Sequence, residues 1–185
     1  MNAVPLVTRL HQHRMWVNQR LLTAAESLNE EQLRQAFQMG QGSVWKSLLH
    51  LYAAEYVWLE ALEGNPSPVL PGDRPDKLPG NQEAEGAIPD LAKLQDNWSA
   101  LDARWEYYLA HLRDGQLDEM VAKTSTRTGP DVKHLTRKSD ILLHVCTHAQ
   151  YTTAQAVNML RQLGVESLPD VMLISLARFE AAPLL

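Results

Sequence analysis

Four long stretches with apolar residues at helical spacing constrain this chain most. In residues 90–113 the apolar side chains alternate at spacings of three and four: Leu91, Leu94, Trp98, Leu101, Trp105, Tyr108 and Leu112. Such a seam is typical of a helix that packs against other helices in a bundle. Similar amphipathic patterns cover residues 6–25, 43–62 and 139–163. The chain is therefore predicted to form four long helices.

The segments between these helices complete the predicted fold. Residues 64–89 carry six of the ten prolines and four of the nine glycines, which indicates a long irregular crossover between the second and third helices. Residues 121–135, around Gly129-Pro130, indicate a short hairpin, and residues 171–179 indicate a short C-terminal helix. We predict an all-α fold in which residues 1–185 form one four-helix-bundle domain.

Composition excludes several classes of function. The net charge is -5 and no cluster of Lys and Arg is present, so nucleic-acid binding is not expected. No apolar run approaches the ~18 residues that span a bilayer, and the N-terminal residues show no secretion signal. The single cysteine, Cys146, rules out an intrachain disulfide, which suits a reducing cytoplasm. We therefore expect a cytoplasmic protein without membrane or nucleic-acid partners.

Three histidines form the candidate site. His144 and His148 are four residues apart in one predicted helix, so their imidazoles share a face, and His50 lies within a second apolar helix. Neutral imidazoles bind zinc or nickel well, and iron or manganese are alternatives that the sequence does not separate. Three protein ligands leave one metal position open, as in catalytic sites. Ordinary core histidines are the alternative reading of this pattern.

Other reactive residues fit the expected chemistry less well. Cys146 faces away from His144 and His148 and is interpreted as a small buried hydrophobe. Glu55 and Glu60 are not three or four residues from His50, so they are not expected to be ligands. The sequence has no GxGxxG, P-loop or GxSxG pattern, which argues against nucleotide binding and common serine hydrolase chemistry.

A set of short motifs is spread over nearly the whole chain: Trp16-x-Asn18 with Leu21-Leu22, Gly42-Ser43, Leu49-His50, Trp58-Leu59, His144-x-x-x-His148, Tyr151, Gln155 and Leu160-Arg161-x-Leu163-Gly164. In the order and spacing of these motifs the sequence resembles the DinB-like superfamily of metal-dependent four-helix bundles. The resemblance implies an up-down-down-up bundle, a divalent metal held by His50, His144 and His148, and a homodimer. Many members carry His-Arg-Gly-Gln where this chain reads Thr152-Thr153-Ala154-Gln155.

The resemblance also sets the expected activity. Some members transfer low-molecular-weight thiols such as bacillithiol, or use mycothiol to isomerise maleylpyruvate. We expect a metal-dependent thiol S-transferase acting on a small molecule, with Asn18, Tyr151 and Gln155 as hydrogen-bonding groups near the metal or substrate. The alternative is a non-enzymatic metal-binding or stress-response protein.

Overall fold

Four long helices make up most of the computed structural model, which describes residues 2–77, 80, 82–125 and 132–181. They are α1 (Val4–Ala25), α3 (Val44–Leu62), α4 (Leu91–His111) and α5 (Lys138–Gln162). Each lies within two residues of its predicted bounds. Side-chain caps set two of the starts: Ser43 Oγ accepts the backbone N–H of Lys46, and Asp90 Oδ1 accepts that of Lys93.

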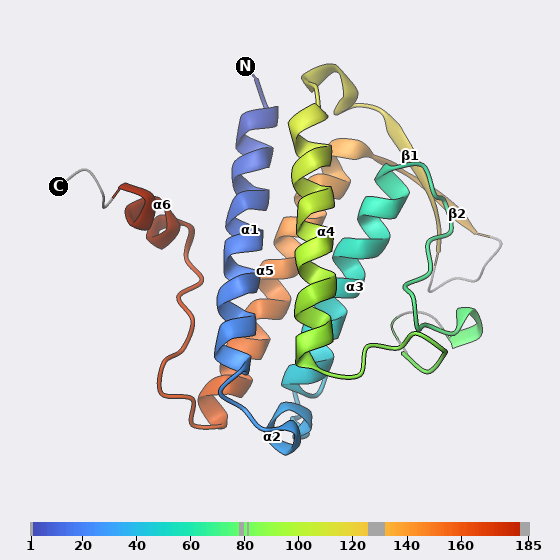
Figure 1. The fold of residues 1–185 in the computed structure, drawn as a ribbon. Coiled ribbons are helices and arrows are strands. Elements are labelled where there is room, and N and C mark those ends of the chain that lie inside the picture. Colours follow the sequence, from blue (N-terminus) through green and yellow to red (C-terminus); the bar gives the residue numbers. More distant parts are fainter. Residues whose placement is uncertain (1, 78–79, 81, 126–131, 182–185) are drawn as a thin grey trace.

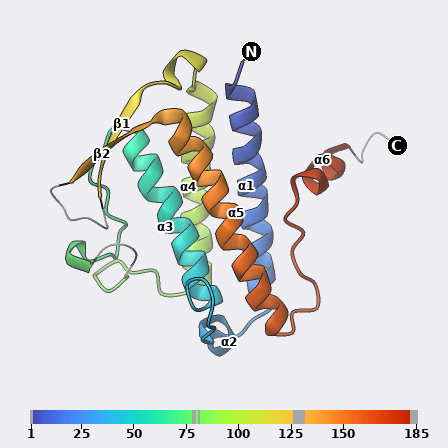
Figure 2. The same ribbon diagram turned by 180° about the vertical axis from the view of Figure 1, so that it is seen from behind.

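The helices form the bundle topology that was expected. α1 and α5 run in one direction and α3 and α4 in the other, so that the parallel pair α3 and α4 needs the long crossover between them (Figure 1). α5 packs most extensively against α3 and α1, and α4 closes the bundle against the same two helices. Seen from behind, α3 and α5 lie side by side (Figure 2).

The core follows the predicted seam. The side chains of Trp98 and Trp105 on α4 are fully buried, and Leu94 and Leu101 are buried with them. Burial of such aromatic side chains contributes on the order of 2–3 kcal/mol each, which makes this seam a main source of bundle stability.

Short elements complete the chain. β1 (Met120–Thr124) and β2 (Lys133–Arg137) pair antiparallel, which confirms the predicted hairpin, although its Gly129-Pro130 segment lies outside the described residues. α6 (Leu173–Ala181) confirms the C-terminal helix. α2 (Glu30–Arg34) was not predicted. None of the helices in the described part of the chain combines the length and apolar character that crossing a bilayer requires.

Candidate metal centre

Two of the three predicted ligands meet between α3 and α5. The Nε2 atoms of His50 and His148 lie 2.9 Å apart, although 98 residues separate them in sequence. Their ring centroids are 4.8 Å apart and the rings are tilted by 56°. Because α3 and α5 pack so closely along their length, residues near the middle of each helix face one another directly.

His144 lies one helical turn from this pair. Its ring centroid is 5.7 Å from that of His148, and it packs edge-on against the indole of Trp58 at 5.6 Å. In the described residues, no group of three or more His, Cys, Asp or Glu side chains is arranged to hold a metal ion. The structure therefore brings His50 and His148 into contact and leaves His144 on the same face, directed at Trp58.

The electrostatics of the three imidazoles favour their neutral form. Partial desolvation by the surrounding side chains lowers the pKa of half-buried His50 and also that of His144, although His144 is exposed to solvent overall. Desolvation also lowers the pKa of His148, to about 4, with further lowering from the neighbouring charges of His50 and His144. Neutral imidazoles at pH 7 present lone pairs to a cation without first losing a proton.

The facing nitrogens fit a metal ion. Two imidazoles bound to one tetrahedral zinc at about 2.0–2.1 Å have their nitrogens about 3.3 Å apart. The 2.9 Å between His50 and His148 needs only a few tenths of an ångström of opening to reach that separation. A nitrogen-only donor set of this kind suits zinc or nickel better than the hard cations magnesium or calcium.

A pocket of about 790 Å³ opens beside the two histidines. Its walls come from α3, α5, the end of α2 and the crossover, and they include both polar and apolar side chains: Arg34, Trp45, Lys46, Leu49, Ala53, Leu70, Gln82, Glu83, Ile88, Tyr151 and Thr152. This volume lies within the range of small-molecule sites. The candidate ligands therefore face a space large enough for an organic substrate.

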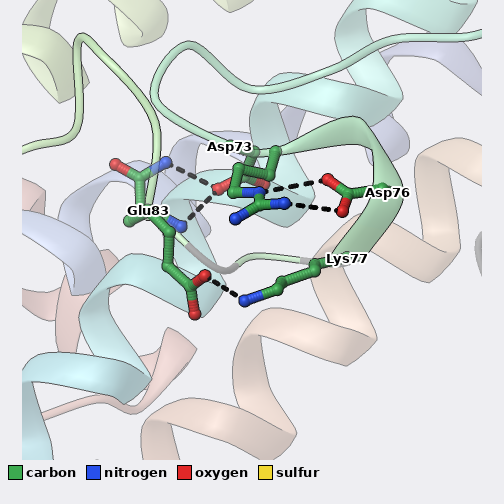
Figure 3. Close-up of polar contacts among 6 residues, drawn as sticks. Asp73, Asp76, Lys77 and Glu83 are labelled. Atoms are coloured by element: carbon green, nitrogen blue, oxygen red, sulfur yellow. Dashed lines mark hydrogen bonds and ion pairs between the residues drawn. The ribbon is translucent and has the colours of Figure 1, made fainter.

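Asp73 organises the crossover wall of this pocket. Its buried carboxylate accepts the backbone N–H groups of Gly80 at 3.1 Å and Gln82 at 2.8 Å, and the side-chain amide of Gln82 at 2.8 Å. Figure 3 shows Asp73 with the neighbouring ion pairs of Asp76 and of Lys77 with Glu83. Gln82 adopts a φ of 51°, a left-handed conformation that is costly for a non-glycine residue. The carboxylate thus holds a strained segment against the site.

The predicted hydrogen-bonding residues lie at different distances from the pocket. Tyr151 is 70% exposed and lines the pocket together with His148. Gln155 is half-buried and packs against Gly40, where a Cβ atom would overlap the amide oxygen of Gln155 unless that side chain moved. Asn18 is fully buried, and its side-chain amide donates to Glu55 Oε1 at 2.7 Å. It lines a separate cavity of about 200 Å³ between α1 and α5.

A buried charge cluster behind the site was not predicted. Glu55 forms an ion pair with Arg14, and both side chains are at most 2% exposed. Trp98 Nε1 donates to Glu55 Oε2 at 3.0 Å, and the guanidinium of Arg14 lies 4.9 Å from the ring of Trp105. The signal was present in the sequence, because Arg14 and Glu55 each interrupt an apolar helix at an inward position.

The remaining reactive groups lie away from the pocket. His11 is directed away from the pocket: its Nε2 pairs with the carbonyl of Leu142 at 3.1 Å and its ring packs on Trp105. Cys146 is buried as expected, and burial raises the pKa of its thiol to about 12. A thiol in that state is a poor nucleophile.

The fold and the facing histidines define a helical bundle with a candidate metal centre between two of its helices, and comparison with known proteins identifies the class. A model of the DinB family matches residues 2–177. The chain belongs to the DinB family, as its sequence motifs indicated.

One solved structure supports the fold. It is YfiT from Bacillus subtilis, described as a probable metal-dependent hydrolase with an unusual four-helix bundle topology. The match has a TM-score of 0.60 and 19% sequence identity, and it covers 85% of this chain and 87% of YfiT. At this identity the likeness shows the shared fold alone. Comparison with curated protein sequences gave no match.

Proposed function

We propose that this DinB-family chain binds a divalent metal ion through His50, His144 and His148 and uses it to activate a low-molecular-weight thiol for transfer to a small electrophile. The observation that carries the proposal is the 2.9 Å contact between the Nε2 atoms of His50 and His148 in the wall of a pocket of about 790 Å³. An isolated pair of core histidines has no need of such a pocket.

His144 is the third ligand in this proposal. It shares a helix face with His148 and is exposed, so a side-chain rotation away from Trp58 is enough to turn its ring toward the other two. Three imidazoles with no carboxylate leave the charge of the metal uncompensated and one position open. Zinc or nickel suits this donor set best, and iron or manganese follow.

A bound divalent metal would lower the pKa of a thiol or water at the open position. Side chains of the pocket would bind and orient the substrate. Trp45, Leu49 and Ile88 give the pocket apolar surface against which the body of a substrate can pack. The hydroxyls of Tyr151 and Thr152 lie in the same wall as His148, where they can orient a polar substrate. Gln155 and Asn18 do not line this pocket. Asn18 donates a hydrogen bond to Glu55 on α3, so any effect of Asn18 on the site is indirect.

Hydrolysis is the second candidate, because the solved structure with the same fold is described as a probable metal-dependent hydrolase. In that case water replaces the thiol and the histidine roles are unchanged. A metal-binding protein without activity is the third. Turnover of a generic electrophile with a panel of small thiols, with and without chelator, separates the three. Thiol- and metal-dependent turnover supports the transferase, thiol-independent turnover supports the hydrolase, and no turnover supports the binding protein.

Metal content tests the ligand set directly. Elemental analysis of the purified protein should find one divalent metal ion per chain. His144→Ala should lose most of this metal, because two imidazole ligands bind a metal ion far more weakly than three. His134→Ala is the matched control, since His134 is exposed on β2 and lies outside the pocket. A His144→Ala protein with a full complement of metal would show that His144 is not a ligand.

We propose a homodimer, because the resemblance implies one for many members of the family, and a cytoplasmic location, because the single cysteine suits a reducing compartment. Sedimentation equilibrium of the full chain measures the oligomeric state.

A further inference from the structure

Lys46 lies one helical turn before the candidate ligand His50. The two residues are four apart on α3, so they share a face and are separated by about 6 Å along the helix axis. Both line the same pocket. The ammonium group of Lys46 makes no hydrogen bond or ion pair with any described residue, and Lys46 is exposed to solvent.

The other charges of the pocket are already paired. Glu83 forms an ion pair with Lys77 at 2.5 Å. Arg34 pairs with Glu30 and stacks on the indole of Trp45 at 4.7 Å. The described pocket walls therefore leave Lys46 as a positive charge without a counter-ion.

Helix stability does not explain this lysine. Lys46 lies in the first turn of α3, where the helix dipole disfavours a cation, and that turn has no acidic residue to offset it. Apolar side chains of Leu49, Leu70 and Ile88 line the same pocket. The walls thus combine an apolar surface, a free cation and two imidazoles.

We propose that the molecule bound in this pocket carries an anionic group, of which a carboxylate is the simplest, and that Lys46 binds this group while the other end of the molecule reaches His50 and His148. The inference rests on the proposed function, because it takes the histidines as the reactive end of the pocket. The substrate class is a small molecule with an apolar body and one anionic end. Lys46 is then a specificity-determining residue.

Cobalt-loaded protein provides a test that does not depend on turnover. A thiol that binds cobalt produces a charge-transfer absorption, so its affinity can be titrated. The probes are 3-mercaptopropionate and its neutral amide, 3-mercaptopropionamide. We expect the acid to bind about fivefold more tightly than the amide, the value of a single partly exposed ion pair of about 1 kcal/mol.

Variants assign this preference to Lys46. Lys46→Gln should abolish the preference without changing the affinity for the amide, and Lys46→Arg should keep it. Lys93→Gln is the matched control: Lys93 occupies the same position in the first turn of α4, has its N–H capped in the same way, and lies outside the pocket. A preference for the acid that survives in Lys46→Gln would place the carboxylate elsewhere and overturn the inference.

A second measurement separates this inference from the proposed function. If neither thiol alters the cobalt spectrum, thiol activation fails. The metal-free protein is then titrated with butyrate and with butyramide by heteronuclear NMR. Shifts in the first half of α3 that occur with butyrate and disappear in Lys46→Gln support the anion site. Equal shifts with both probes, or none with either, refute it.

Discussion

Replacing Glu55 with glutamine should strongly destabilise the bundle. Glu55 and Arg14 are at most 2% exposed, and the carboxylate also accepts hydrogen bonds from Asn18 at 2.7 Å and Trp98 at 3.0 Å. Glu55→Gln keeps the shape of the side chain but removes its charge, which leaves the Arg14 guanidinium buried without a counter-ion. The new amide group also faces donors on every side.

The expected cost follows from that geometry. Removing one partner of a buried ion pair costs about 3–5 kcal/mol, a third or more of the free energy of unfolding of a typical domain. For a chain of this size the loss corresponds to a fall in Tm of roughly 8–15 °C. Urea denaturation followed by far-UV circular dichroism measures the free energy, and a thermal scan measures Tm.

Two further variants test whether the loss of stability comes from the unpaired charge of Arg14. Glu60→Gln, on the same helix, removes a carboxylate whose pair with Arg104 is partly exposed, and it should cost less than about 1 kcal/mol. Arg14→Met combined with Glu55→Gln removes both charges and should recover most of the stability lost by Glu55→Gln alone. Equal effects of Glu55→Gln and Glu60→Gln, or a double variant less stable than Glu55→Gln, would refute the account.

Three other predictions concern pH and backbone geometry. Burial, and then the charge of Glu55, raise the pKa of Asp102 to about 7; the folded state therefore keeps a proton that the unfolded chain loses near pH 4, and stability falls as pH rises through this window. Asp102→Asn should thus raise the free energy of unfolding at pH 8 by about 2–4 kcal/mol and have little effect at pH 4, and equal effects at both pH values in urea titrations would contradict this. Gly72 has a φ of 88°, and a Cβ there would overlap the backbone of Ala87. Gly72→Ala should therefore lower the free energy of unfolding by at least about 1–2 kcal/mol and speed amide hydrogen exchange in residues 82–88. Unchanged exchange would argue against this close approach. Because the pKa of His148 is about 4, metal content by elemental analysis should stay constant from about pH 8 to 6.5 and fall only at more acidic pH, and release beginning above pH 7 would contradict a site of neutral imidazoles.

Periodicity was enough to predict the long helices, because their stability comes from continuous apolar faces that the sequence displays. The seam predicted for residues 90–113 is the buried face of α4 (Leu91–His111). The crossover was equally visible, since proline and glycine exclude regular structure. α2 has only five residues, too few for a periodic pattern, and its signal is local: Asn29 and Gln32 form a capping box.

The candidate site was predictable only in part, for a reason that differs from residue to residue. Spacing places His144 and His148 on one face, but the direction of the His144 ring depends on its contact with Trp58, and a sequence does not reveal side-chain rotation. Lys46 follows from the same spacing rule applied backward from His50. The role of Asp73 depends on how the crossover folds back on itself, which local sequence does not encode.

The buried cluster and the candidate site are linked through the rotation of α3. Glu55 follows His50 by five residues, so its side chain leaves the helix about 140° away around the axis. On that side it is bound to Arg14 and Asn18 of α1 and to Trp98 of α4. These contacts fix the angle of α3 within the bundle, and that angle directs His50 at His148 on α5. A small rotation of α3 would separate two nitrogens that now lie 2.9 Å apart. Glu55, which has no place among the proposed ligands, thus contributes to the orientation of His50 through the packing of α3, together with the buried leucines of the same helix.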